Sequence, residues 1–343
     1  MIELVQPLLA GDRRALARLL TAVENERPGI EQALAALFPH TGRAWIIGVT
    51  GAPGTGKSSL VNALAYSYRA DGKTVGILAV DPTSPFSGGA ILGDRIRMRD
   101  LTGDKGVFIR SMATRGSLGG LARATRDAIR LLDAAGFDIV MIETVGAGQS
   151  EVDIVRAAQT TLVVEAPGMG DDVQAIKAGI LEIADVLVVN KADKPGVDNT
   201  VRGLKAMLEL GHPVARDQIA SHHGTLLPLE PAANGHNPAF WLPPIVRAVA
   251  TEGQGIDDVK VAIQAHRDYL AGHSRLRDLE RQHIEIELYD RLRAALMTRL
   301  LQTIPAGAVQ QVIDRIQARE IDPGMAVGEI LAFQDQSKAK VQS

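Results

Sequence analysis

The sequence contains no cysteine among its 343 residues, which excludes disulfide bonds, thiolate metal sites and cysteine nucleophiles. It also lacks any apolar stretch near the ~20 residues that a bilayer-spanning helix needs. The opening segment MIELVQPLLAGDRRALARLL has acidic and basic residues too early, and too short an apolar run, for a signal peptide. We therefore expect a cytoplasmic protein with no membrane partner.

Neither sign of charge dominates, because 37 Lys and Arg residues face 40 Asp and Glu residues and the net charge is −3. No whole-protein positive field attracts phosphodiester backbones, so nucleic acid is a poor candidate for the main partner. The chain is 46% hydrophobic, which is enough to build one full-sized core with smaller appendages.

From Ala44 onwards, short apolar runs alternate with helix-like segments. The runs are AWIIGV, TVGILAV, GVFIR, DIVMIE, TTLVVEA and ADVLVVN, and WLPPIVRAVA follows as a last strand. Several runs are nearly continuous in Val, Ile and Leu, which a strand requires when helices cover it on both faces. The pattern predicts an α/β fold with a mostly parallel sheet, helices on both of its faces, and helical extensions at each end of the chain.

The helical extensions suggest a three-part division of the chain. We predict an N-terminal helical extension over 1–40, a main domain over 41–272 and a C-terminal helical arm over 273–343. Within the main domain, 211–240 is rich in Pro, Gly, Asn and His and reads as a loop insertion. The arm carries apolar residues four apart, a ridge that packs on a helix of the same chain or of a second copy. They are Ile284, Leu288, Leu292, Leu296 and Leu300.

The segment GAPGTGKSS matches the Walker A pattern and lies between a predicted strand and a predicted helix, as a phosphate loop should. Its glycines let successive N–H groups face one anion, and the helix N-terminus adds partial positive charge. Lys57 would reach the β and γ phosphates, and the Ser58 hydroxyl would ligate Mg²⁺. The nucleotide-binding residues predicted here are Gly51, Ala52, Pro53, Gly54, Thr55, Gly56, Lys57, Ser58 and Ser59.

Acidic residues at strand ends are candidate ligands of Mg²⁺, which prefers hard oxygen atoms. Asp81 follows TVGILAV, Glu143 follows DIVMI, and Asp94 lies in the polar loop SGGAILGDR. For Asp81, which precedes Pro82, a turn or helix N-cap is an equally good interpretation.

The purine base is read elsewhere, at NKAD after the strand VLVV. Asp193 can accept two hydrogen bonds from guanine N1–H and the N2 amine, whereas adenine would leave it unpaired. Lys191 can lay its aliphatic stem along the base, and Asn190 can tie this loop to the phosphate loop. Val249, Ala250 and Thr251 would form the last wall of the base site.

Glu143-Thr144-Val145-Gly146 resembles the D-x-x-G switch element of GTPases, with Glu in place of Asp. Gly146 could sense the γ-phosphate through its N–H. Many small GTPases orient water with a Gln directly after that glycine, whereas this chain has Ala147 and places Gln149 two positions later. We therefore predict slow intrinsic hydrolysis that a partner accelerates.

Two arginines in FIRSMATRG are further candidates for catalysis. Arg110 and Arg115 could neutralise charge that develops on the phosphates, or could equally pair with surface carboxylates.

Longer blocks make a family resemblance recognisable. The blocks DPTSPFSGGAILGDRIRM, FIRSMATRGSLGGLARATRDA, AAGFDIVMIETVGAGQSE and GMGDDVQAIKAGILEIADVLVVNKAD resemble the MeaB/ArgK family, the G-protein chaperones of methylmalonyl-CoA mutase. The resemblance covers about 48–193 and resumes at about 241–270.

The resemblance implies a P-loop GTPase of the signal-recognition and MinD-like (SIMIBI) class that gates cofactor delivery to an adenosylcobalamin-dependent mutase and protects or reactivates it. It also implies Mg²⁺ contacts for Ser58, Asp81, Asp94 and Glu143. It implies that GMGDDVQAIK, up to Lys177, is a mobile segment that reports nucleotide state to the mutase. It also implies that the C-terminal helices form a homodimer arm. The chain has no attached cobalamin-binding domain, so the mutase would be a separate protein. The 211–240 insertion is longer than the family pattern leads us to expect.

Other functional classes compete with this interpretation. A metal-insertion accessory GTPase usually carries Cys and His ligands, but this chain has no Cys, and its pair His222-His223 lies in the predicted insertion. A kinase linked to amino-acid transport would need an acceptor site that the sequence does not reveal. A partitioning-type ATPase is disfavoured by Ala52, where that class has Lys, and by NKAD.

Overall fold

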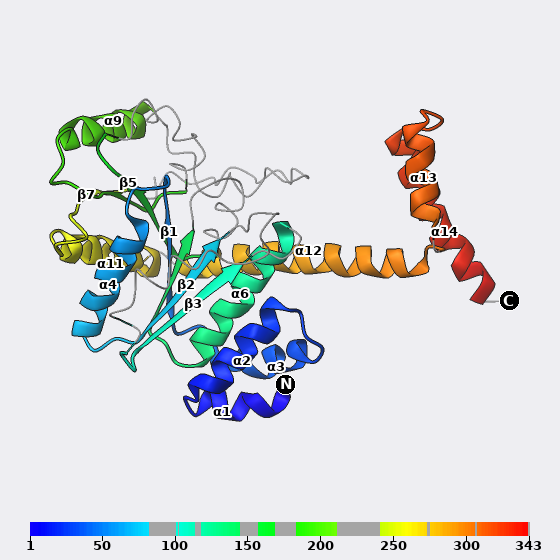
Figure 1. The fold of residues 1–343 in the computed structure, drawn as a ribbon, viewed down its shortest axis with the longest axis horizontal. Helices are drawn as coiled ribbons and strands as arrows, with labels where there is room; N and C mark the ends of the chain where they lie inside the picture. Colours follow the sequence, from blue (N-terminus) through cyan, green and yellow to red (C-terminus); the bar gives the residue numbers. More distant parts are fainter. Residues whose placement is uncertain are drawn as a thin grey trace. The chain divides into compact units, whose positions relative to one another are not determined.

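In the computed structural model the chain forms two compact units, Met1–Leu279 and Glu280–Ser343 (Figure 1). The residues that the structure describes are 1–81, 101, 103–113, 118–144, 157–168, 183–210, 241–272, 275–305 and 307–341. The predicted 211–240 insertion therefore lies outside the described residues.

The first unit is built on a seven-stranded sheet in the order β3-β2-β4-β1-β5-β6-β7, and every neighbouring pair is parallel. All seven predicted runs form strands, which confirms the α/β prediction. The strands are β1 Trp45–Thr50, β2 Val75–Asp81, β3 Val107–Ala113, β4 Ile139–Thr144, β5 Thr160–Glu165, β6 Val186–Val189 and β7 Ile245–Arg247.

Helices cover both faces of the sheet, as the continuous apolar runs required. Every residue of β1, β4 and β5 is buried, because successive side chains enter opposite cores. Ile47 packs into the core under α4 (Lys57–Ala70) and α11 (Ile256–Gly272), whereas Ile46 packs into the core under α6 (Leu118–Ala134). Helix α9 (Val197–Leu210) lies against β6 and β7.

The N-terminal extension packs against α6 and joins the first unit. It consists of the 3₁₀ turns η1 (Ile2–Leu4) and η2 (Phe38–His40) and the helices α1 (Val5–Leu9), α2 (Arg13–Glu24) and α3 (Ile30–Leu37). Asp133 of α6 accepts hydrogen bonds from the backbone N–H groups of Arg43 and Ala44, 3.1 and 2.9 Å away, and so fixes the link to β1.

The second unit is helical. Helix α12 (Arg275–Thr303) begins in the first unit, and α13 (Ala308–Gln317) and α14 (Pro323–Val341) follow. Arg315 of α13 pairs with Glu329 of α14 at 2.6 Å. Four residues of the predicted apolar ridge on α12 are exposed, and these are Ile284, Leu288, Leu292 and Leu296. None of the described helices has the length and apolar composition that a bilayer crossing requires.

Candidate functional site

The predicted phosphate loop lies between the end of β1 at Thr50 and the start of α4 at Lys57, which confirms the strand, loop and helix order. Gly51, Gly54 and Gly56 have φ angles of 139°, 83° and 92°, a region that favours glycine. A Cβ on Gly51 would lie 2.1 Å from the Val164 carbonyl oxygen, and one on Gly56 would lie 2.3 Å from Asn190 Nδ2. These positions therefore require glycine for space as well as for conformation.

Lys57 folds over the loop that it follows. Its Nζ donates to the carbonyl oxygens of Gly51 at 2.7 Å and Ala52 at 3.1 Å, and the residue is only 6% exposed. The N-cap residue of α4 is Gly56, which has no side chain, so no N-cap side chain competes with an anion for the first N–H groups of the helix. The loop thus presents a cation and a helix N-terminus at one place.

The structure brings together two of the predicted magnesium ligands. Ser58 Oγ donates to Glu143 Oε1 at 2.5 Å, although the two residues lie 85 positions apart, and Glu143 is 2% exposed. This contact arises because β4, which carries Glu143, pairs directly with β1. A hydroxyl and a buried carboxylate supply the hard oxygen atoms that Mg²⁺ prefers, so the residues fit that ion.

The other two predicted ligands are less well defined. The backbone of Asp81 ends β2, next to β4, since Val80 pairs with Thr144. Its side chain and all of Asp94 lie outside the described residues. Their magnesium contacts remain predictions.

The NKAD loop follows β6 and is joined to the phosphate loop. Asn190 Nδ2 donates to the Thr55 carbonyl oxygen at 2.9 Å, and Asn190 Oδ1 accepts from the Ala250 N–H at 3.0 Å. Lys191 Nζ donates to the Gly54 carbonyl oxygen at 2.8 Å, and Lys191 has a left-handed φ of 55°. The predicted tie between Asn190 and the phosphate loop is therefore confirmed. Asp193, at the end of the NKAD loop, is exposed.

Val249, Ala250 and Thr251 follow β7 in a tight loop. Val249 N–H donates to the Gln254 carbonyl oxygen at 2.9 Å, and a Cβ on Gly255 would lie 2.1 Å from the Arg247 carbonyl oxygen. Since Asn190 Oδ1 holds the Ala250 N–H, the predicted last wall of the base site stands beside the NKAD loop.

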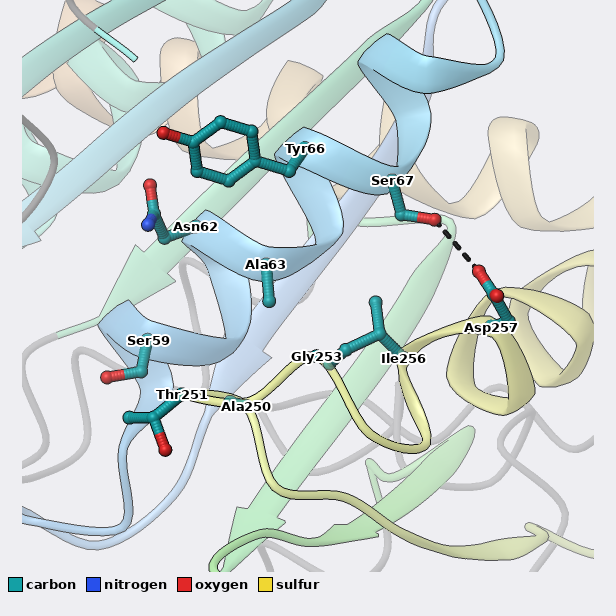
Figure 2. A pocket seen from close by; sticks show the side chains of 10 residues that line it. All are labelled: Ser59, Asn62, Ala63, Tyr66, Ser67, Ala250, Thr251, Gly253, Ile256 and Asp257. Atoms are coloured by element: carbon teal, nitrogen blue, oxygen red, sulfur yellow. Dashed lines mark hydrogen bonds between the residues drawn. The ribbon is translucent and has the colours of Figure 1, made fainter. Parts of the chain in front are cut away.

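A cavity of about 630 Å³ opens beside this loop and runs along α4 (Figure 2). Its volume falls in the range of ~300–1,000 Å³ that is usual for small-molecule sites. Its lining comprises Ser59, Asn62, Ala63, Tyr66, Ser67, Ala250, Thr251, Gly253, Ile256 and Asp257. Sequence reasoning missed the α4 residues beyond Ser59, although their spacing of three, four, seven and eight positions after Ser59 marks one helix face.

Arg110 lies in β3 and takes the second of its two expected roles. Its guanidinium forms an ion pair with Glu24 of α2 and donates to Thr21 Oγ1 at 3.2 Å. In register, Arg110 of β3 pairs with Leu78 of β2, Leu78 with Ile142 of β4, and Ile142 with Gly48 of β1. Three strand-to-strand spacings, about 14 Å in total, therefore separate the backbone of Arg110 from β1. The side chain therefore joins the N-terminal helices to the sheet and does not face the phosphate loop.

Several residues of the predicted site lie outside the residues that the structure describes. They are Gly146, Gln149, Arg115, the segment 169–177 that ends at Lys177, and the pair His222-His223. Within the described part of the chain, no three His, Asp or Glu side chains gather closely enough to hold a metal ion together.

The chain is similar to known proteins over most of its length. A family model described as methylmalonyl Co-A mutase-associated GTPase MeaB matches residues 16–304. A putative GTPase of Pyrococcus abyssi is 45% identical over 329 residues, which is 96% of this chain and 95% of that protein. A mitochondrial methylmalonic aciduria type A homolog of Caenorhabditis elegans is 29% identical over 94% of this chain and 80% of its own length. The crystal structure of a LAO/AO transport system kinase matches with a TM-score of 0.65 and 25% identity, covering 97% of both chains.

Proposed function

The chain belongs to the family of methylmalonyl Co-A mutase-associated GTPases, MeaB, and from that premise we propose that it is a GTP-driven chaperone of a separate adenosylcobalamin-dependent mutase. It is a GTPase, and we expect hydrolysis of GTP to gate cofactor loading and to protect or reactivate the mutase. The observation that supports this best is the junction of the phosphate loop with the NKAD loop through Asn190.

Guanine would be selected by Asp193, the last residue of the NKAD loop. Asp193 accepts hydrogen bonds from guanine N1–H and the N2 amine, and adenine offers an acceptor at N1 instead. A polar group left unpaired costs about 1–3 kcal/mol, and more when it is charged, so guanosine nucleotides are preferred. Because Asn190 bonds to Thr55 and to Ala250, the phosphate and base sites keep a fixed spacing.

The phosphate end of the site supplies the charges that hydrolysis needs. Lys57 would leave the carbonyl oxygens of Gly51 and Ala52 for the β and γ phosphates of the nucleotide. Ser58 and Glu143 would hold Mg²⁺, which neutralises phosphate charge when bound. With Ala147 after the switch glycine, we propose slow hydrolysis until a partner completes the site. Gln149, Gly146 and Arg115 remain candidates for that step.

A route from nucleotide to partner begins at β5. Gly51 lies against the backbone of Val164, so the phosphate loop touches the end of this strand. The family resemblance assigns the segment that follows β5, up to Lys177, to reporting nucleotide state to the mutase. We place the coupling there.

The exposed row on α12 supports a homodimer. Leu288 and Leu292 are 62% and 48% exposed, and Ile284 and Leu296 extend the same apolar ridge. Burying such a ridge against a second copy would remove it from water. We propose that the C-terminal helices form this interface.

The test is a pull-down with purified adenosylcobalamin-dependent mutase in the presence of GDP and of a non-hydrolysable GTP analogue. We expect binding that differs between the two nucleotides. The matched control is Asp193→Ala, which should remove the nucleotide dependence. Equal and negligible binding in both states would contradict the chaperone role.

A second candidate, a kinase linked to amino-acid transport, is favoured only by the name of the transport system kinase that matches this chain. It predicts transfer of the γ-phosphate of labelled GTP to a protein acceptor. The chaperone proposal predicts that all label leaves as inorganic phosphate.

A further inference from the structure

The cavity beside Ala250 is a groove that is open to solvent. Helix α4 lines one side of it, and the loop after β7 and the start of α11 line the other (Figure 2). Four of the ten lining residues are exposed, namely Tyr66, Thr251, Gly253 and Asp257. A free small molecule is usually enclosed over roughly 70–90% of its surface. An open groove is better suited to a side chain that a larger partner presents.

The groove carries one charge, and that charge is negative. Among the described residues of the lining, only Asp257, in the first turn of α11, is charged. Its Oδ1 accepts a hydrogen bond from Ser67 Oγ at 3.0 Å. Within the described part of the chain no Lys or Arg pairs with Asp257, and the nearby Lys260 pairs with Asp71 at 2.6 Å. The carboxylate of Asp257 is therefore open to a cation from outside the chain.

The other walls of the groove also suit a basic side chain. Ser67 and Thr251 bring hydroxyl oxygens, which accept hydrogen bonds from N–H donors. Ala63 supplies apolar surface for the aliphatic stem of an Arg or Lys. Tyr66 is 44% exposed and offers an aromatic ring, which attracts cations. The groove thus combines one carboxylate with the apolar and aromatic surface that a long basic side chain needs.

The residues next to the lining add negative charge. Glu252 lies between Thr251 and Gly253 in the sequence, Asp258 follows Asp257, and both Glu252 and Asp258 are exposed. Opposite charges steer two surfaces together, and like charges suppress the wrong partners. A basic protein surface is therefore favoured here over an acidic peptide or a phosphate group.

One side chain connects the groove to the nucleotide loops. Ala250, which lines the groove, donates its N–H to Asn190 Oδ1 at 3.0 Å, and Asn190 Nδ2 donates to the Thr55 carbonyl oxygen at 2.9 Å. The described lining contains no residue of Gly51–Ser58 or of NKAD. A partner could therefore occupy the groove beside a bound nucleotide, and would lie one residue away from the side chain that joins both loops.

We propose that this groove is a docking site for the mutase, in which an Arg or Lys side chain of the mutase pairs with Asp257 and lays its stem along Ala63 and Tyr66. The proposal rests on the chaperone function proposed above. It adds a second contact surface, separate from the segment up to Lys177, and it assigns the recognition at this surface to charge.

The first experiment compares Asp257→Lys with Asp258→Lys in titrations with purified adenosylcobalamin-dependent mutase, in GDP and in a non-hydrolysable GTP analogue. The variants make the same charge change in the same turn of α11, but of the two residues only Asp257 belongs to the described lining. Asp257→Lys should weaken mutase binding at least tenfold, because it sets like charges against each other, and Asp258→Lys should weaken it about threefold or less. Equal mutase affinity in the two variants would overturn the proposal.

The second experiment removes the charge without changing the shape of the groove. Asp257→Asn keeps the side-chain volume and an oxygen that accepts from Ser67 Oγ. This variant should bind the mutase about threefold or more weakly at low salt, and its binding should depend less on salt than that of the wild type. An affinity and a salt dependence equal to those of the wild type would contradict recognition by the carboxylate.

Other occupants of the groove would give different results, and each would reject this proposal. If Asp257→Lys alone lost GDP affinity tenfold, the groove would belong to the nucleotide site. If Asp257→Lys alone changed the oligomeric state in light scattering, a second copy of the chain would occupy the groove.

The chaperone function and the docking site fail in different ways. If the wild type binds no mutase in either nucleotide state, the chaperone proposal fails and the docking site fails with it. If the wild type binds the mutase and Asp257→Lys binds it equally well, the chaperone proposal stands and the docking site alone is wrong.

Discussion

Replacing Asn190 by alanine would cut the connection between the three loops of the nucleotide site. Asn190 is 2% exposed, and its amide bonds the Thr55 carbonyl oxygen at 2.9 Å and the Ala250 N–H at 3.0 Å. Alanine would leave both backbone groups without these partners. The backbone of the three loops would remain, but its spacing would no longer be held.

The expected size of the effect follows from those two contacts. Each buried backbone group left unpaired costs about 1–3 kcal/mol, so the pair costs roughly 2–6 kcal/mol before water recovers a part. Because 1.4 kcal/mol is a factor of about ten, we expect GDP affinity to fall at least tenfold. The free energy of unfolding should fall too, since the same contacts hold the loops in the protein without nucleotide.

The assay is calorimetry with GDP, together with thermal unfolding in the presence and absence of GDP. Asn190→Asp is the informative companion, because it keeps an acceptor for the Ala250 N–H but sets a carboxylate against the Thr55 carbonyl oxygen. Asn199→Ala, an exposed change on α9, is the matched control and should behave like the wild type. If Asn190→Ala bound GDP as tightly as the wild type, the reasoning that the loops need this side chain would be refuted.

Three further predictions concern the metal, the N-terminal helices and the second unit. Glu143→Gln should raise the Mg²⁺ concentration needed for half-maximal GTP binding at least tenfold in a magnesium titration. An unchanged titration would remove Glu143 from the ion site. Arg110→Ala should lower the free energy of unfolding by about 1–3 kcal/mol, because Glu24 loses its partner, while hydrolysis per folded molecule stays constant; a drop in single-turnover hydrolysis would restore Arg110 to the mechanism. Leu288→Glu combined with Leu292→Glu should convert a dimer into a monomer in light scattering without changing GDP affinity, and a dimer that persists would locate the interface elsewhere.

The strands and the loops at their ends could be predicted from the sequence because their signals are local. Continuous runs such as IVMIE in β4 require cover on both faces, and the structure places helices there. The meeting of Ser58 with Glu143 follows from one further rule, that the carboxyl ends of parallel strands share an edge of the sheet.

The remaining features depend on how distant elements pack, which no local pattern specifies. From the sequence alone, Arg110 is equally suited to neutralise phosphates or to pair with carboxylates. The ion pair with Glu24 depends on α2 lying next to β3. The α4 wall of the cavity has a visible helical spacing, but Ile256 and Asp257 reach it only because α11 lies against α4. The α12 ridge is visible in the sequence, but its burial in the proposed dimer would depend on a second copy of the chain, which no local pattern specifies.

The proposed selectivity for guanosine nucleotides depends on the phosphate loop together with the separate aspartate, Asp193. Calorimetry with Mg²⁺ and GDP, GTP, ADP or ATP tests it most directly. We predict that guanosine nucleotides bind at least tenfold more tightly than adenosine nucleotides, and that Asp193→Ala abolishes the preference. Equal affinities for the two purines, or no binding heat with any of them, would contradict the account.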